Sequence, residues 1–118
     1  NINTASTSIL KYISGLTILG GEPFSPQNQK VIVELIKKFK EKFPKKTLWM
    51  YTGYVLEKDL LPGQRKHVAG VTGLILDSID TLVDGPFILA ERNLSLKFRG
   101  SNNQRILDKD KIKELRNA

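Results

Sequence analysis

Three short apolar segments, each followed by a loop that contains glycine, constrain the fold of this chain most strongly. Residues 15–19, 47–52 and 79–83 are rich in strand-forming side chains. Stretches with helical spacing or turn signals separate them. Strands that alternate with helices in this way form right-handed βαβ units. We therefore expect an α/β fold with a mainly parallel sheet.

The clearest helix is expected to begin after Ser25 and to stop before Pro44. Ser25 offers a capping hydroxyl, and Pro26 is favourable as a first helical residue. The apolar side chains between them recur at helical spacing, which places on one face Ile32, Leu35, Ile36, Phe39 and Phe43.

The remaining elements are shorter. Residues 55–61 predict a short helix, whereas residues 71–76 fit either a helix or a strand. Further short strands are predicted at residues 96–99 and 105–107, and a charged helix from residue 108.

Composition indicates one ordinary globular domain. The chain has 118 residues, of which 40% are hydrophobic and 26% are charged, values that argue against disorder. No apolar run approaches the roughly 20 residues that cross a bilayer, and no secretory signal begins the chain. We expect a cytoplasmic protein without a membrane partner.

The charge balance is basic, with 19 lysines and arginines against 12 acidic residues and a net charge of +7. Much of the excess comes from the lysines of residues 30–46, which alternate with apolar positions. This spacing favours a solvated helix face over a surface for an acidic partner. No motif supports a nucleic-acid partner.

The sequence contains no cysteine. Disulfides, thiolate zinc sites and cysteine-ligated iron–sulfur clusters are therefore excluded within these residues. We also find no catalytic carboxylate pair, no nucleophile with a nearby base and no phosphate-binding glycine loop. We predict neither a catalytic residue nor a metal ligand in the chain.

A binding site is expected where the parallel strands end, because ligands of such sheets lie outside the carboxyl ends. Gly20 and Gly21 allow a ligand to approach bare backbone, whose carbonyl groups suit an ammonium group. Glu22 adds a negative charge, and Pro23 fixes the exit into the helix. The alternative is that these glycines serve only a tight strand-to-helix turn.

Two further loops reach the same edge of the sheet. Thr52 supplies a hydroxyl, and Gly53 allows a second close approach to the backbone. Asp84 directly follows a predicted strand, where its carboxylate can accept hydrogen bonds from a ribose or hold a cation. Simple loop capping by Asp84 explains the same position equally well.

Residues 99–105 are polar around a glycine. Arg99, Asn103 and Arg105 can bind a carboxylate or a partner protein surface, or the segment can be a plain hairpin turn.

Taken in order, these motifs resemble the activating proteins of anaerobic ribonucleotide reductase, a family of short radical S-adenosylmethionine proteins. The resemblance covers residues 13–107. It rests on four ordered segments, Gly-Leu-Thr-Ile-Leu-Gly-Gly-Glu-Pro-Phe, Leu-Trp-Met-Tyr-Thr-Gly-Tyr, Leu-Val-Asp-Gly-Pro-Phe and Leu-Lys-Phe-Arg-Gly-Ser-Asn-Asn-Gln-Arg.

The resemblance implies a partial, open (β/α) barrel. It implies that the motif Gly20, Gly21, Glu22 and Pro23 binds the amino group of S-adenosylmethionine, with Thr52, Gly53 and Asp84 as further cofactor contacts. In this family a 4Fe-4S cluster, held by a CxxxCxxC loop, converts the cofactor to a 5′-deoxyadenosyl radical. That radical takes a hydrogen atom from a glycine of the reductase. The resemblance also implies an electron donor such as flavodoxin as a second partner.

The chain departs from this family because the CxxxCxxC segment, expected several tens of residues before Gly15, is absent. We interpret residues 1–12 as a lead-in or remnant, residues 13–107 as a radical S-adenosylmethionine core truncated at the N-terminus, and residues 108–118 as the charged helix. The chain alone is expected to be inactive. An unpaired edge at residues 15–19 suggests a homodimer. The alternative is a non-catalytic α/β module that binds a nucleotide or a partner.

Overall fold

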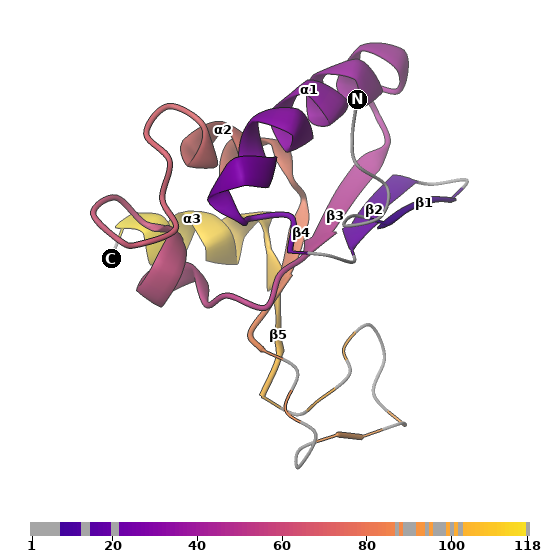
Figure 1. Ribbon diagram of the computed structural model, residues 1–118. Helices are drawn as coiled ribbons and strands as arrows, with labels where there is room; N and C mark the ends of the chain where they lie inside the picture. Colours follow the sequence, from indigo (N-terminus) through magenta and orange to yellow (C-terminus); the bar gives the residue numbers. More distant parts are fainter. Residues whose placement is uncertain are drawn as a thin grey trace.

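The strands lie in the sheet in the order in which the chain forms them. The computed structural model describes residues 8–12, 15–19, 22–86, 88, 92–93, 95, 99, 101 and 103–117. Its elements (Figure 1) are β1 (Ser8–Tyr12), β2 (Gly15–Leu19), α1 (Pro26–Lys42), β3 (Thr47–Tyr51), the single π-helical turn η1 (Leu56–Leu60), α2 (Thr72–Ser78), β4 (Thr81–Asp84), β5 (Arg105–Asp108) and α3 (Lys109–Asn117).

The sheet has five strands in the order β1-β2-β3-β4-β5, with β1 and β5 outermost. The central strands β2, β3 and β4 are parallel, while β1 and β5 pair antiparallel with their neighbours. The predicted α/β class is therefore confirmed, and the parallel part of the sheet is its centre. The sheet is open, because its first and last strands lie at opposite edges.

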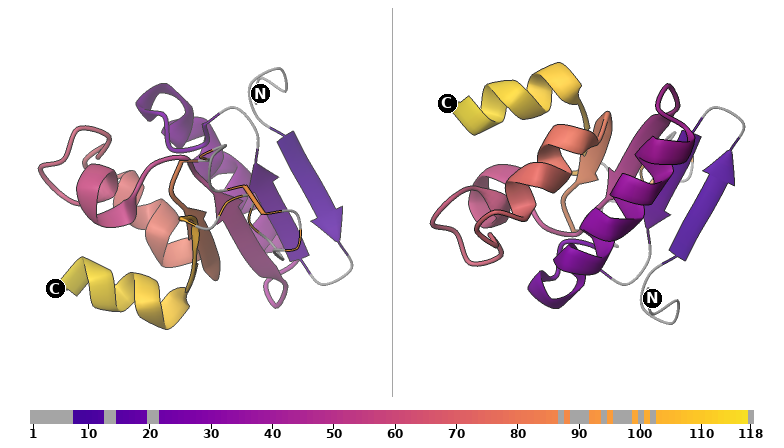
Figure 2. Two further views of the ribbon diagram at one scale, coloured as in Figure 1. Left: turned by 90° about the horizontal axis from the view of Figure 1, so that it is seen from below. Right: turned by 90° about the horizontal axis from the view of Figure 1, so that it is seen from above.

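The core lies between one face of the sheet and the helices. Strand register places Ile18, Met50, Leu82 and Leu107 in one row across the sheet, and each is at most 4% exposed. Helices α1, α2 and α3 add buried side chains to the same core, among them Ile32, Ile36, Ile75 and Ile112. In Figure 2, α1 lies behind the strands when seen from below and in front of them when seen from above.

Helix α1 occupies the predicted range, with Pro26 in its first turn and its end just before Pro44. The predicted cap by the Ser25 hydroxyl is wrong, because Ser25 makes no side-chain cap hydrogen bond. The backbone closes this turn instead: the Asn28 amide donates to the Ser25 carbonyl at 2.8 Å, and the Ser25 amide donates to the Glu22 carbonyl at 3.1 Å.

The predicted unpaired edge of residues 15–19 is also wrong. Strand β1 pairs along the whole of β2, from Ser8 opposite Leu19 to Tyr12 opposite Gly15. The two strands are separated by only two residues, so a hairpin forms with little loss of chain entropy. The edge that we assigned to a homodimer is therefore occupied, and residues 8–12 of the assigned lead-in belong to the sheet.

The shorter elements mostly agree with their predictions. The ambiguous segment at residues 71–76 is part of helix α2, and the predicted third strand corresponds to β4. The strand at residues 105–107 and the C-terminal helix are confirmed as β5 and α3. The predicted strand at residues 96–99 falls largely outside the described residues. None of the described helices has the length and hydropathy of a membrane span.

Truncation of a core side chain tests this packing. Leu82→Ala is expected to lower the free energy of unfolding by about 2 to 5 kcal/mol, because Leu82 is fully buried and its truncation leaves a cavity in the core. The matched control is Leu74→Ala, since Leu74 is 49% exposed and its loss should cost less than about 1 kcal/mol. Urea denaturation measures both, and equal effects would contradict the assignment of the core.

Candidate functional site

The carboxyl ends of the three parallel strands meet at one edge of the sheet, which we call the rim, and define as residues 22–24, 52–56 and 84–86. Backbone hydrogen bonds join its second and third loops. The Thr52 amide donates to the Val83 carbonyl at 2.9 Å, and the Gly85 amide donates to the Tyr54 carbonyl at 2.8 Å. Gly20 and Gly21, which belong to the predicted cofactor motif, lie outside the described residues.

The carboxylate of Glu22 joins the first and second loops of the rim. Its Oε2 atom accepts hydrogen bonds from the Phe24 amide at 2.9 Å and from the Thr52 hydroxyl at 2.6 Å. Its Oε1 atom accepts one from the Gly53 amide at 2.6 Å. The structure thus brings together the predicted residues Glu22, Thr52 and Gly53.

Glu22 retains both charge and acceptor capacity. A carboxylate offers about four lone-pair positions, and the three donors leave one of them, on Oε1. All three donors are neutral, and no ion pair between described residues includes Glu22. This carboxylate can therefore accept a hydrogen bond from a cationic ligand group.

Gly53 suits this arrangement because a side chain at its position would crowd the Glu22 carboxylate. A Cβ atom at residue 53 would lie 3.3 Å from Glu22 Oε1, tighter than ordinary van der Waals contact. Gly53 itself is exposed. Its backbone is therefore open to a ligand at the point where Glu22 is held.

Pro23 is buried and directs the chain from Glu22 into α1. The Glu22 carbonyl accepts a hydrogen bond from Asn28 Nδ2 at 3.0 Å, in addition to the Ser25 amide. The backbone of Glu22 is consequently anchored to the first turn of α1, and Pro23 contributes shape to this turn.

Asp84 lies at the end of β4, with no exposed surface, and is bound within the protein. Its Oδ1 accepts a hydrogen bond from Arg105 Nε at 2.8 Å, and its Oδ2 accepts from Arg105 Nη2 at 2.5 Å and the Leu56 amide at 2.9 Å. These contacts favour the loop-capping role for Asp84. They also fix the backbone that follows Gly53 and Tyr54.

Arg105 bridges two carboxylates from different elements. Besides Asp84, its guanidinium donates to Glu57 of η1 at 3.1 Å and 2.5 Å. The hydrogen bonds from Arg105 lower the pKa of Glu57. The pKa of Arg105 is raised, most by its hydrogen bonds to Asp84 and next by those to Glu57. We call Asp84, Arg105 and Glu57 the rim brace, because they tie β4, β5 and η1 together.

The other two residues predicted to bind a partner also contact the chain itself. Asn103 Nδ2 donates to the Pro86 carbonyl at 2.7 Å, and Arg99 Nη1 donates to the Gln104 carbonyl at 2.8 Å. Gln104 Nε2 in turn donates to the Gly85 carbonyl at 3.0 Å. Asn103 and Gln104 thus support the third loop of the rim, and Arg99 supports it through Gln104.

Sequence reasoning missed Gln29, a buried residue that supports the rim. Its Nε2 donates to the Phe24 carbonyl at 2.7 Å and to the Lys66 carbonyl at 2.9 Å, and its Oε1 accepts from the Thr72 hydroxyl at 2.5 Å. Gln29 precedes Ile32, Val33 and Ile36 on the buried stripe of α1. The sequence does contain a signal for this role, because Gln29 is a polar residue at the helical spacing of the buried apolar residues.

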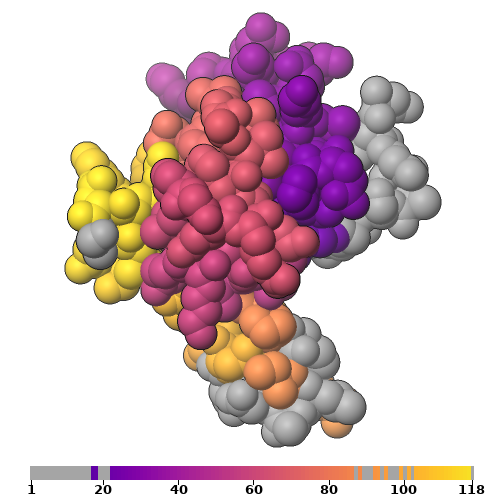
Figure 3. Space-filling view, turned by 60° about the vertical axis from the view of Figure 1, so that its left-hand side comes forward, coloured from indigo at the N-terminus to yellow at the C-terminus, as the bar shows by residue number. Residues whose placement is uncertain are grey.

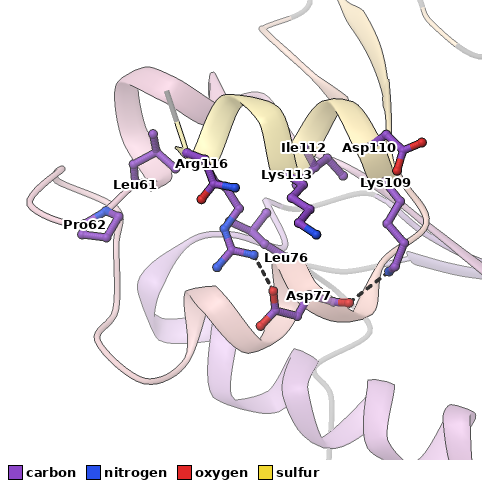
Figure 4. A pocket seen from close by; sticks show the side chains of 10 residues that line it. Leu61, Pro62, Leu76, Asp77, Lys109, Asp110, Ile112, Lys113 and Arg116 are labelled. Atoms are coloured by element: carbon purple, nitrogen blue, oxygen red, sulfur yellow. Dashed lines mark hydrogen bonds and ion pairs between the residues drawn. The ribbon is translucent and has the colours of Figure 1, made fainter.

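A separate groove of about 550 Å³ lies between α3 and the region of Leu61 and Leu76 (Figure 4). Two of its cations are already engaged. Lys109 Nζ donates to the Asp77 and Ile79 carbonyls, both at 3.0 Å, and Arg116 pairs with Asp77 at 2.5 Å. These contacts fasten α3 to the end of α2, so Lys109 and Arg116 have structural roles.

Removal of the Arg105 guanidinium tests the rim brace. In Arg105→Met the buried Asp84 keeps only the Leu56 amide, so the free energy of unfolding at neutral pH should fall by about 2 kcal/mol. The matched control is Arg65→Met, since the Arg65 side chain is 74% exposed in its pair with Asp59 and such pairs contribute at most about 1 kcal/mol.

The same variant changes the dependence of stability on pH. Because its pKa is lowered in the folded protein, ionised Glu57 stabilises the fold at pH values above the ordinary pKa of a glutamate. This contribution is lost as the pH falls through the lowered pKa. Carbon-detected NMR titration should therefore find the Glu57 pKa lower in the wild type than in Arg105→Met. Equal Glu57 pKa values would contradict the brace.

Comparison with known proteins identifies relatives. Residues 3–107 match the family described as a 4Fe-4S single cluster domain. The chain is 38% identical over 97 residues to a protein of Enterobacteria phage T4, covering 80% of this chain and 53% of that protein. It is 40% identical over 93 residues to one of Pasteurella multocida, covering 76% and 52%, and 36% identical over 90 residues to one of Escherichia coli K12, covering 76% and 53%.

Each of these relatives is named anaerobic ribonucleoside-triphosphate reductase-activating protein. The chain spans about half the length of the relatives that it matches. No solved structure matches it.

The residues present do not fit the cluster for which the family is named. The sequence has no cysteine, and the described residues contain no group of three or more His, Asp or Glu side chains that could hold a metal ion. The match of residues 3–107 nevertheless spans most of the chain, including β1 to β4 and the rim. The chain therefore belongs to the 4Fe-4S single cluster domain family, and it lacks the thiolates that would hold such a cluster.

Proposed function

We propose that this chain forms the S-adenosylmethionine-binding part of a radical S-adenosylmethionine activase for anaerobic ribonucleotide reductase. Three kinds of support agree. The curated relatives are named as activating proteins of that reductase. The motif Gly20, Gly21, Glu22 and Pro23 follows β2, and the rim has a polar arrangement suited to a cationic ligand.

The proposal depends on the state of the Glu22 carboxylate. It is held in place by neutral donors, has one acceptor position left and lies beside the exposed backbone of Gly53. S-adenosylmethionine has two cationic groups, an α-ammonium and a sulfonium. An ammonium group that donates to Glu22 Oε1 would complete the hydrogen bonding of this carboxylate.

The other residues have supporting roles in this proposal. Gly20 and Gly21 offer backbone to the cofactor, Pro23 shapes the turn, and Thr52 and Gly53 hold Glu22 in place while they border the ligand. Asp84 acts on the site through the Leu56 amide and Arg105. Arg99, Asn103 and Arg105 support the loop that would face the reductase.

The proposal also includes the finer properties of the radical enzymes. These are a glycine of the reductase as the site of the radical, flavodoxin as the electron donor, the cytoplasm as the compartment, and an open (β/α) barrel to which this sheet belongs. In such enzymes a bound cluster supplies the electron that cleaves the cofactor. Because these residues include no cysteine, we assign no radical step to them.

A second candidate function is a non-catalytic module that binds a nucleotide or the reductase without radical chemistry. This candidate requires no cysteine, and these residues contain none. The two candidates differ in the ligand that they predict, because a general nucleotide module would prefer ATP, whereas the first requires a ligand with an ammonium group.

A ligand titration tests the proposed function. NMR-monitored titration of the wild type should give saturable binding of S-adenosylmethionine and weaker binding of ATP. Glu22→Gln should weaken binding of S-adenosylmethionine about tenfold, because a charge-assisted hydrogen bond is lost. It should leave 5′-methylthioadenosine unaffected, since that compound lacks the amino-acid end.

The matched control is Glu34→Gln, because Glu34 is an exposed residue of α1 and its change removes the same charge. Far-ultraviolet circular dichroism verifies that each variant is folded. Preferential binding of ATP, or equal affinity of Glu22→Gln and the wild type for S-adenosylmethionine, would overturn the proposal.

A further inference from the structure

A second charged side chain borders the rim, and its charge is opposite in sign to that of Glu22. Lys66 is half-buried in the loop between η1 and α2, and its ammonium group lies 5.4 Å from the centre of the Tyr54 ring. Tyr54 follows Gly53 directly, and its amide donates to the same Thr52 hydroxyl that binds Glu22. Glu22 and Lys66 therefore both contact the short loop of Thr52, Gly53 and Tyr54.

These two opposite charges do not pair. The ion pairs between described residues include neither Glu22 nor Lys66. The face of Tyr54 attracts the Lys66 ammonium without neutralising it. Each charged group thus remains available to a ligand.

The backbones that hold the two charges are tied together by Gln29. One buried amide group, Gln29 Nε2, donates to both the Phe24 and the Lys66 carbonyls. Figure 3 shows the resulting packing, in which the loop between η1 and α2 lies against the first turns of α1. A buried contact consequently holds the backbone of Lys66 near that of Phe24, two residues after Glu22.

The loop of Lys66 is fixed at further points along its length. The Lys66 amide donates to the Asp59 carbonyl at 2.9 Å, and His67 Nδ1 lies 2.9 Å from the Leu60 carbonyl. The Thr72 hydroxyl accepts a hydrogen bond from the Val68 amide at 2.8 Å. A fixed backbone with an ammonium group at the end of a long side chain suits the binding of an anionic group.

An α-amino acid group has an ammonium and a carboxylate on one carbon atom. A site for it needs an anion and a cation close together that do not neutralise each other. We propose that Lys66 binds the carboxylate of the methionyl end of S-adenosylmethionine while Glu22 binds its ammonium group. This inference rests on the proposed function and adds the carboxylate subsite to it.

Neighbouring cations are less suitable for this role. Arg65 pairs with Asp59 at 3.2 Å, and Arg105 is held by Asp84 and Glu57. The Lys66 ammonium group differs from both, because among the described residues it contacts an aromatic ring at the rim and no carboxylate.

The test compares two ligands that differ only in the carboxylate, S-adenosylmethionine and its decarboxylated form. Wild-type protein should bind S-adenosylmethionine more tightly. Lys66→Met should weaken that binding about fivefold to tenfold, because one charged contact is lost, and should leave the decarboxylated ligand unchanged. Lys66→Arg, which keeps the charge, should recover part of the preference.

The matched control is Lys45→Met, which removes the same charge from an exposed residue just before β3, at the amino end of that strand. Its affinity for both ligands should equal that of the wild type. Urea denaturation shows whether Lys66→Met remains folded.

The outcomes separate the two proposals. If the wild type binds S-adenosylmethionine and Glu22→Gln weakens it, but Lys66→Met does not, the role of Lys66 is wrong and the proposed function stands. Equal weakening of both ligands by Lys66→Met would mean that Lys66 only supports the fold, and would also overturn the inference. If the wild type does not bind S-adenosylmethionine, both proposals fail.

Discussion

The hydrogen bonds of the Glu22 carboxylate hold the rim together. They join the loop after β2 to the loop after β3, two segments that the parallel sheet only brings near each other. The donors are two backbone amides and a hydroxyl, so the carboxylate is oriented without being neutralised. A charged group that is fixed and still lacks a counter-ion among the described residues is poorly explained by stability alone.

The third strand end is organised in a different way. Asp84 is fully buried, and its contacts with Arg105 and the Leu56 amide leave it directed into the protein. Asp84 has a cationic partner, Arg105, in the rim brace, whereas Glu22 has none among the described residues. In the proposed site, Glu22 would therefore meet the ligand, while Asp84 would hold the neighbouring loops in position.

Much of this architecture could be predicted from the sequence, because apolar strands that end at glycine and an amphipathic helix are local signals. The pairing of Arg105 with Asp84 could not be predicted, because the two residues are distant in sequence and each has several plausible partners. Strand β1 was missed because its apolar residues lie within a polar segment, where tertiary pairing decides the structure. Lys66 gave no signal, as its position at the rim depends on the buried amide of Gln29.

We propose that the rim binds the amino-acid end of S-adenosylmethionine, with Glu22 against Gly53 and Lys66 against Tyr54. The most direct measurement is an amide NMR map of the folded chain during titration with that ligand. Binding at the rim should give saturable shifts centred on the amides of Phe24, Gly53 and Lys66. Shifts confined to the groove between α3 and Leu61, with these amides unchanged, would contradict it.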